Sequence, residues 1–470
     1  MNFKYLLILL ICIVSRVLTS IYYIEDIDSL RFALSNENFD VINNQPHFPG
    51  YPLFCFLSKI FFSISNSSAI SFSIIGGFAV FLIYYYTHKI LSLFGFEKIH
   101  WAVFFIIFSH PFLWVMSNRY MPDVLGLAIL ISGVYFLIIS IRNYNLNHAI
   151  ILFFIIGLES GVRLSYVPFF IPATYILFKY KRNLIKLLLS FIFSISIWLF
   201  PFVIDTGWDN IFDIGFRNTS GHFFEWGGTI ASSTDSYIIR FLGLIRAIIA
   251  EVFSSWWPGR SLFTLSMSLF SITATVYFFF SKKLNVLRDN SKLILLLCIL
   301  VYGIWIFYFQ NIVYKPRHIL PFLPFWFLII TYFYTNIKIK YRSFAVVFIS
   351  IFLMFQSFIC YRLVNSHLSP TSISQTKDWI KSNSGDDLVV CADGLFSFYY
   401  KKHSELNNSI FISSENKMDL VNEFNNGKKI CSYMNLDNII GEKPNNIVQF
   451  YHNPSSNRLW SHLILRVYEK

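Results

Sequence analysis

Three carboxylates lie within four residues directly after the first apolar run of the chain: Glu25, Asp26 and Asp28. Charges this close to a hydrocarbon layer are costly, which makes them candidates for function. A carboxylate can act as a general base that removes a proton from an attacking hydroxyl or amine. Arg31 follows three residues after Asp28, so on a helix its guanidinium would face that acid and tune its pKa. The simpler interpretation is that the acids mark a membrane interface.

A proline-rich element lies further along the same segment, in the run Gln45-Pro46-His47-Phe48-Pro49-Gly50-Tyr51-Pro52. Three prolines and a glycine so close together exclude a continuous helix and predict a rigid turn. A turn that only reverses the chain does not need a titratable group. His47 is therefore a candidate for substrate contact, together with the neighbouring Tyr51.

Other charged residues lie at the ends of apolar runs or between them. Asp123 follows a tight turn at 117–123, Arg163 separates two short apolar runs, and Arg317 and His318 precede a late one. A guanidinium at the end of a span can stabilise a departing phosphate group. The alternatives are an interfacial anchor for Arg317 and an internal ion pair for Arg163.

The elements that carry these residues are apolar. Only 14% of the 470 residues are charged and 55% are hydrophobic. A soluble protein needs more polar residues than this to cover its surface. Runs of spanning length (about 20 residues) lie at 5–23, 68–88, 99–117, 121–141, 184–204, 260–281, 291–309, 319–336 and 343–362. Two shorter runs, 147–158 and 165–179, predict short or broken helices. We therefore predict a polytopic α-helical membrane protein with about eleven transmembrane helices.

The net charge of +12 does not indicate nucleic-acid binding, because lysine and arginine gather in short clusters between the apolar runs. The clusters near 89–98, 142, 179–186, 282–292 and 338–342 all alternate onto one side. By the positive-inside rule this side is the cytoplasm, where the N-terminus also lies. The outer loops are then 24–67, 117–123, 205–259 and 310–318. The first run lacks a small-residue cleavage site, so we expect it to be retained.

The chain changes character after residue 362. Short β-type runs at 388–390, 410–412, 447–450 and 463–465 alternate with helix-like stretches at 373–381 and 418–424. We predict a transmembrane domain over 1–362 and a small extracytoplasmic α/β domain over 363–470. Cys391 and Cys431 lie at strand-like positions on the oxidising side of the membrane. The sequence is therefore compatible with a disulfide between them but does not require one.

Taken in order, these motifs resemble the GT-C glycosyltransferases. The nearest groups are family 39, of the protein O-mannosyltransferase and aminoarabinose-transferase type, and relatives with a PHPPGYPL element. The resemblance rests on the acids after the first span, the proline-rich element, the acid of 117–123, a G-x5-R-x4-P pattern at 157–168 and an R-x-x-L-P-x-L-P pattern at 317–324. The usual first signature is Asp-Glu, whereas this chain has Glu25-Asp26-Ile27-Asp28. Both Asp26 and Asp28 therefore stay candidates for the base.

This resemblance implies a polyprenyl-phosphate-sugar-dependent glycosyltransferase of EC class 2.4, in a bacterial inner membrane. The donor would be a polyprenyl-phosphate sugar, and the acceptor a glycan, glycolipid or protein. The implied catalytic residues of an inverting displacement are Asp28, Asp26, Glu25 and Asp123. The implied phosphate-binding residues are Arg317, His318 and Arg163, and His47, Arg31 and Tyr51 belong to the substrate loop. No cofactor is required, although Asp26 and Asp123 leave a divalent metal open.

Two other functions compete with this interpretation. An O-antigen-type polymerase or ligase also has many spans, but it typically carries functional arginines in a large late loop. A lipid-linked glycan transporter or flippase binds near the midplane, often between repeats. This sequence has no recognisable repeat and places its acids just outside the first span. We therefore expect Glu25, Asp26, Asp28, His47, Asp123 and Arg317 to share an outward-facing cavity of a transferase.

Overall fold

The computed structural model describes residues 3–96, 100–233, 235–255, 261–281, 289–312, 315–385 and 387–470. Parts of the basic clusters near 98 and 282–288 lie outside these residues. The chain forms two compact units, each with its own interior: Met1–Ser20 with Leu34–Val364, and Ile21–Ala33 with Asn365–Lys470. The predicted boundary after 362 falls close to Val364. The segment Ile21–Ala33, which we predicted within the first outer loop of the transmembrane domain, groups instead with the C-terminal residues.

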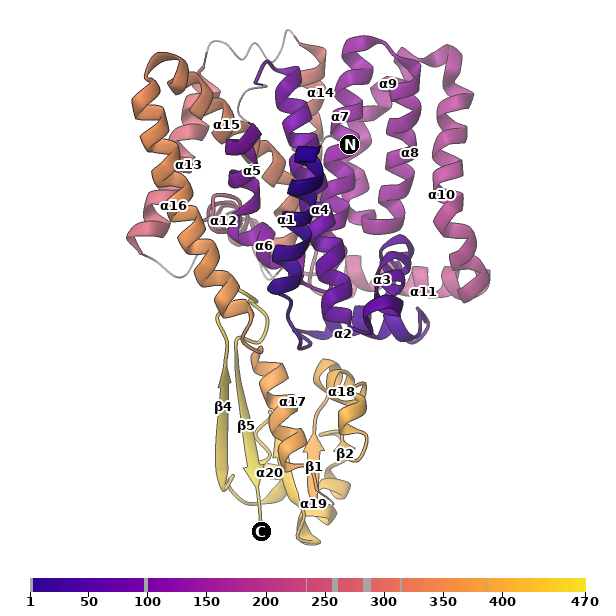
Figure 1. Ribbon diagram of the computed structural model, residues 1–470. Coiled ribbons are helices and arrows are strands. Elements are labelled where there is room, and N and C mark those ends of the chain that lie inside the picture. The colour runs from indigo at the N-terminus through magenta and orange to yellow at the C-terminus, as the bar shows by residue number, and fades with distance from the viewer. Residues whose placement is uncertain are drawn as a thin grey trace. The chain divides into compact units, whose positions relative to one another are not determined.

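The first unit is built on a row of neighbouring helices: α1 (Phe3–Leu18), α4 (Ser68–Leu93), α7 (Asp123–Asn143), α8 (Leu146–Arg163) and α10 (Leu184–Thr206). Each packs against the next in this order (Figure 1). Small residues permit the close approach. A Cβ atom on Gly77 of α4 would lie 2.6 Å from the Cα of Ile13 in α1, and one on Gly157 of α8 would collide with Ser194 of α10.

A broken span completes the packing around α1. The helices α5 (His100–Phe108) and α6 (Pro111–Asn118) meet at an angle of 60°, because Pro111 has no N–H to continue the hydrogen-bond ladder. In an apolar layer the freed carbonyls need other donors. Arg16 Nη2 donates to the carbonyl of Phe108 (3.2 Å), and Gln356 Nε2 donates to that of Ile106 (2.7 Å). Arg16 therefore has a structural role: it stabilises this bend by binding a carbonyl that the break in the helix leaves free of a helical hydrogen bond.

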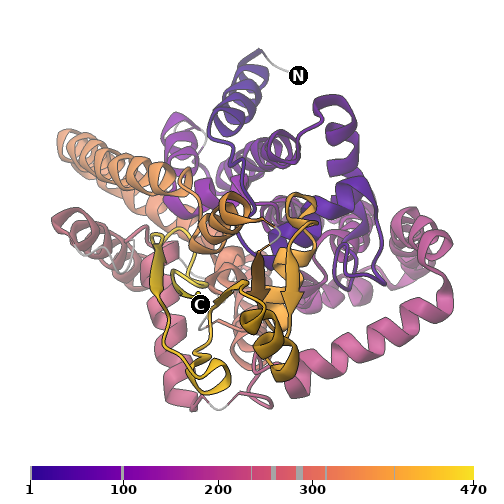
Figure 2. The same ribbon diagram turned by 90° about the horizontal axis from the view of Figure 1, so that it is seen from below.

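The remaining elements of the first unit include further spans and crosswise helices. Figure 2 views the spans nearly end-on and shows α11 running across them. The elements are α3 (Pro52–Ser65), the 3-10 helix η2 (Leu164–Thr174), α9 (Tyr175–Lys179), α11 (Trp208–Ser220), α12 (Tyr237–Ala247), α13 (Leu262–Phe280), α14 (Asn290–Phe309), the 3-10 helix η8 (Pro316–Phe322), α15 (Leu323–Lys340) and α16 (Arg342–His367). A further helix, α2 (Ile27–Glu37), joins the two units along the chain.

Among the described residues, eight helices are long and apolar enough to cross a membrane, or nine if α5 and α6 count as one span. The short runs at 147–158 and 165–179 form one stretch, Leu146–Lys179, in which η2 interrupts the α-helix. The first predicted run forms α1, which has 16 residues. The count of about eleven and the side of the membrane on which each loop lies stay predictions.

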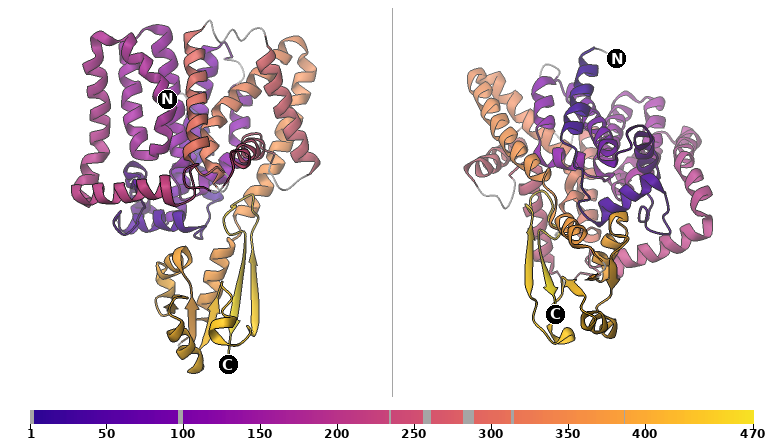
Figure 3. Two further views of the ribbon diagram at one scale, coloured as in Figure 1. Left: turned by 180° about the vertical axis from the view of Figure 1, so that it is seen from behind. Right: turned by 60° about the horizontal axis from the view of Figure 1, so that its bottom comes forward.

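The second unit contains a mixed five-stranded sheet with the order β2-β1-β3-β5-β4. The strands β1 (Leu388–Cys391), β2 (Ile410–Ile412) and β3 (Lys429–Ser432) are parallel, and β4 (Asn446–Tyr451) and β5 (His462–Tyr468) form an antiparallel hairpin (Figure 3). The helices are α17 (Ser372–Asn383), α18 (Gly394–Lys401), α19 (Lys417–Asn425) and α20 (Asp437–Ile440). The predicted α/β domain is confirmed; β3 was not among the predicted strand runs.

The two cysteines of this sheet do not form a disulfide; both are free and buried. Cys431 pairs in register with Val390, and Cys391 pairs with Ser432. Because side chains alternate along a strand, Cys391 and Cys431 point to opposite faces of the sheet. Burial raises the pKa of the Cys431 thiol to about 12. Cys391 lies in the core formed with α19, where it packs as a small apolar side chain.

Acid should destabilise the second unit through His403. Burial lowers the pKa of this imidazole to about 4 from an ordinary value near 6.5. The unfolded chain then binds the proton more readily, so stability present above pH 6.5 is lost as the pH falls toward 4. We expect a loss of about 2 kcal/mol between pH 7 and pH 5. Amide hydrogen exchange of β1 and β3, corrected for the intrinsic exchange rate at each pH, measures this loss of stability. The decrease in stability with falling pH should be smaller in His403→Gln than in the unmodified protein. An equal pH dependence of stability in both proteins would contradict the prediction.

Candidate functional site

A buried ion pair joins two spans of the first unit. Asp123 begins α7 and Arg163 ends α8, and Asp123 Oδ1 lies 2.9 Å from Arg163 Nη2. Gly126, one turn after Asp123, permits this contact, because a Cβ atom there would lie 2.7 Å from that of Arg163. Of the two alternatives for Arg163, the structure therefore has the internal ion pair. A pair of this kind can still present the free edge of the guanidinium to an anion.

The proline-rich element reaches the same arginine. Arg163 Nη1 donates to the hydroxyl of Tyr51 (3.4 Å), and this hydroxyl lies 3.3 Å from His47 Nε2. Tyr51 has a positive φ of 45°, an uncommon conformation for a residue with a side chain, and follows Gly50 at φ 83°. The structure thus brings His47, Tyr51, Arg163 and Asp123 into one chain of contacts.

The late basic residues lie close to the turn that carries Asp123. Arg317 belongs to η8, and its Nη1 lies 2.9 Å from the sulfur of Met121. The backbone of the next residue, His318, accepts a hydrogen bond from the hydroxyl of Tyr302 (2.8 Å). These contacts place the half-buried Arg317 and the buried His318 beside the turn at 117–123. The first unit therefore gathers both predicted phosphate-binding segments.

Glu159 is a residue of this cluster that the sequence prediction missed. It is fully buried, and neither carboxylate oxygen has a hydrogen-bond partner among the described residues. A Cβ atom on Gly126 would lie 3.1 Å from its Oε1, so the carboxylate borders the Asp123–Arg163 pair. Its sequence signal was an acid inside an apolar run, four residues before Arg163.

The three acids after the first span belong to the second unit, and two of them have defined structural partners there. Glu25 Oε1 lies 3.0 Å from His367 Nε2, and both side chains are buried. Asp26 precedes α2 and acts as its N-cap, because its Oδ1 accepts a hydrogen bond from the Ser29 N–H (2.8 Å). Its Oδ2 lies 3.4 Å from Asn457 Nδ2.

Asp28 lies in the first turn of α2 and is the most exposed of the three acids. Arg31 lies beside it, with 3.5 Å between Nη1 and Oδ1, as the three-residue spacing predicted. The guanidinium also lies 5.1 Å from the ring of Phe398. A half-buried carboxylate that is less covered than the two buried acids is the one of the three best placed to receive a proton from outside the protein.

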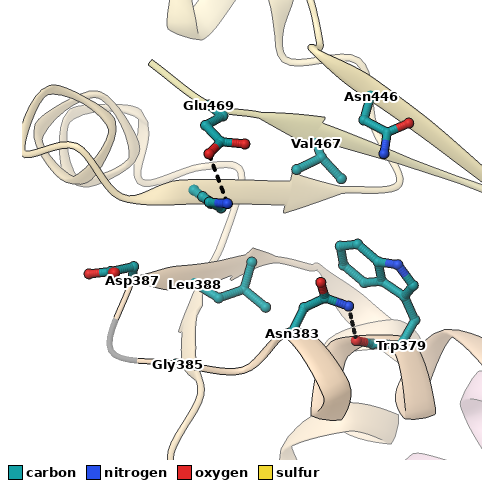
Figure 4. A pocket seen from close by; sticks show the side chains of 9 residues that line it. Trp379, Asn383, Gly385, Asp387, Leu388, Asn446, Val467 and Glu469 are labelled. Carbon is teal, nitrogen blue, oxygen red and sulfur yellow. Dashed lines mark hydrogen bonds and ion pairs between the residues drawn. The ribbon is translucent and has the colours of Figure 1, made fainter.

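The second unit also contains an open cleft of about 320 Å³, shown in Figure 4. It lies between the end of α17, which contributes Trp379 and Asn383, and the sheet edge where β1 and β3 begin. Lys429 of β3 and Glu469, which follows the neighbouring strand β5, form an ion pair of 2.8 Å in the lining of this cleft. None of the predicted site residues lines this cleft. Open α/β sheets place their binding sites at the opposite edge, where parallel strands end.

The two groups of predicted residues lie in different units, so the expected common cavity stays a prediction. The first unit holds Asp123, Arg163, Arg317, His318, His47 and Tyr51, and the second holds Glu25, Asp26, Asp28 and Arg31. Among the described residues, no three His, Cys, Asp or Glu side chains gather in a way that could hold a metal ion. The use of a divalent metal by Asp26 or Asp123 remains untested.

No family model matches the sequence, and no curated protein matches it. The fold matches two crystal structures of ArnT from Cupriavidus metallidurans. The structure bound to undecaprenyl phosphate has a TM-score of 0.54 and 10% identity, covering 98% of this chain and 97% of that chain. The apo structure has a TM-score of 0.56, with the same identity and coverage. The predicted resemblance to the GT-C aminoarabinose-transferase type is confirmed for the fold, and the chain is an integral membrane protein.

Two matched substitutions test the buried cluster. Asp123→Asn removes the charge that pairs with Arg163, so we expect a loss of about 2–4 kcal/mol in the free energy of unfolding. Glu159→Gln makes the same chemical change at a carboxyl group without a hydrogen-bond partner among the described residues, so it should cost less than about 1 kcal/mol, because it breaks no ion pair or hydrogen bond that the structure shows. The losses of stability of the two purified variants are compared by thermal unfolding in the same detergent. Equal losses would contradict the assigned geometry.

Proposed function

We propose that this protein is a membrane glycosyltransferase that moves a sugar from a polyprenyl-phosphate donor to an acceptor on the outer face of a bacterial inner membrane. The observation that carries the proposal is the full-length likeness to ArnT, whose crystal structure contains undecaprenyl phosphate. The clustering of basic residues beside the turn of Asp123 supports it independently. The N-terminus is then cytoplasmic and the α/β unit extracytoplasmic, in agreement with the basic clusters.

Arg317, His318 and Arg163 are the residues proposed to bind the donor phosphate. Arg317 lies at the start of an apolar stretch, Pro316–Ile337, where a lipid headgroup would meet the protein. A guanidinium presents paired N–H donors that match phosphate oxygens. His47 and Tyr51 would then contact the substrate next to Arg163, to which Tyr51 is hydrogen bonded. Asp123 would keep Arg163 oriented, and it is the residue that would orient the acceptor.

Asp28 is the proposed general base. It would take the proton from an acceptor hydroxyl or amine while that atom forms a bond to the anomeric carbon. The bond between this carbon and the phosphate oxygen breaks in the same displacement. Polyprenyl phosphate leaves with the bonding electrons, and its new negative charge is stabilised by the basic residues. One displacement inverts the anomeric centre.

The base is identified by comparing Asp28→Asn with Asp26→Asn. Loss of the proton acceptor should lower transfer by about 10²–10⁴-fold in Asp28→Asn. Asparagine is as good an N-cap as aspartate, so Asp26→Asn keeps the start of α2 and should retain most activity. Transfer is measured with radiolabelled undecaprenyl-phosphate mannose, glucose and aminoarabinose and bacterial envelope acceptors. The mechanism is wrong if both variants transfer normally, and the base is Asp26 if the order is reversed.

Donor binding is tested at Arg317. We expect Arg317→Ala to raise the Kd for undecaprenyl phosphate about tenfold, because one charge-assisted contact to the phosphate is lost. Arg217→Ala serves as the matched control, since Arg217 is exposed and its ion pair among the described residues is with Asp213, one turn before it in α11. Native mass spectrometry of the detergent-solubilised protein measures both. Equal affinities of Arg317→Ala and the unmodified protein would remove Arg317 from the phosphate site.

A further inference from the structure

The acidic segment after the first span is bonded to residues near the other end of the chain. Two of its backbone carbonyls accept hydrogen bonds from the C-terminal part of the second unit. The Tyr399 hydroxyl donates to the carbonyl of Ile24 (2.7 Å), and Thr371 Oγ1 donates to that of Glu25 (2.9 Å). These contacts fix the main chain immediately before α2, the helix that carries Asp28 in its first turn.

Side-chain contacts hold the same segment from other directions. His367 pairs with Glu25 in a buried site, and its backbone carbonyl accepts a hydrogen bond from the Tyr23 hydroxyl (2.6 Å). Asn457 approaches Asp26, the N-cap of α2. Tyr399 and Asn457 are themselves buried. The segment is thus anchored by backbone and side-chain contacts at each of the four residues 23–26, which directly precede α2.

These anchors come from one edge of the sheet. The helix α18, which holds Tyr399, follows the carboxyl end of β1. Asn457 lies in the connection between β4 and β5, and Ser372, next to Thr371, donates its N–H to His452 at the start of that connection (2.9 Å). The carboxyl edge of the parallel strands is where open α/β sheets place functional groups. Here that edge holds a segment from the far end of the chain.

We propose that the α/β unit positions the general base, and that Tyr399 and His367 are positioning residues for Asp28. The inference rests on the proposed role of Asp28. By fixing the carbonyls of Ile24 and Glu25, the unit sets where α2 begins and hence where the Asp28 carboxylate lies. Small displacements of a reacting group have large effects on rate. The α/β unit would therefore contribute to transfer without contacting the sugar.

Kinetics of the full-length protein test the proposal, with undecaprenyl-phosphate mannose, glucose and aminoarabinose as donors. Tyr399→Phe should lower kcat about 5-fold to 10-fold, through the loss of one buried hydrogen bond, with little change in KM. His367→Ala should lower kcat more, and His367→Gln should recover part of it by restoring a polar side chain beside Glu25. Tyr451→Phe is the matched control, because among the described residues its hydroxyl donates to Gln449 in the same strand, β4, and not to the acidic segment.

A double-mutant cycle separates positioning from a general loss of stability. In the Asp28→Asn background, Tyr399→Phe should have no further effect on residual transfer. Deuterium exchange of 24–33 should be faster in Tyr399→Phe, whereas exchange of β1 and β3 should not change. The proposal is overturned if kcat and this exchange are both unaffected, or if Tyr399→Phe lowers transfer equally in both backgrounds. Full transfer by Asp28→Asn would instead refute the assigned base, while the exchange measurement would still report on the anchoring.

Discussion

A guanidinium in an apolar layer needs acceptors or a compensating charge, and the arrangement of the first unit depends on how this requirement is met at Arg163. Arg163 is buried between spans, and Asp123 supplies the compensating charge at 2.9 Å. The pair fixes the end of α8 against the beginning of α7, and Gly126 gives it space. Breaking such a pair leaves an uncompensated charge, which is far more costly than the pair itself. The proline-rich element then docks on this fixed arginine through Tyr51.

The sequence was sufficient for the coarse fold because the signals were strong. Long apolar runs predicted the spans, and alternating short strands predicted the α/β unit. The spacing of Asp28 and Arg31 correctly predicted their contact, since three residues nearly complete a helical turn. The strand β3 was missed as a run, because Lys429–Ser432 contains only two apolar residues and is stabilised by its neighbours on both sides.

Other features depend on contacts between distant parts of the chain, which local patterns do not contain. Glu25, Asp26 and Asp28 look alike in the sequence, but Glu25 pairs with His367 and Asp26 caps a helix. Nothing near residue 25 indicates a partner at 367. Glu159 carried a readable signal, an acid inside an apolar run, but it had no motif to draw attention to it. Cys391 and Cys431 appeared compatible with a disulfide until the strand register placed them on opposite faces.

The anchoring of Ile21–Ala33 by residues beyond 365 has a consequence for biosynthesis. A ribosome makes the acidic segment first and its partners Tyr399 and Asn457 last. The segment therefore has to wait for these partners while the intervening spans insert, and its final conformation can form only after Asn457 has been made. A chain truncated after α16 would contain the described spans and the acids Glu25, Asp26 and Asp28, but it would lack Tyr399 and Asn457, which hold the segment. Synthesis of the residues beyond 365 thus becomes a condition for the folding of the acidic segment.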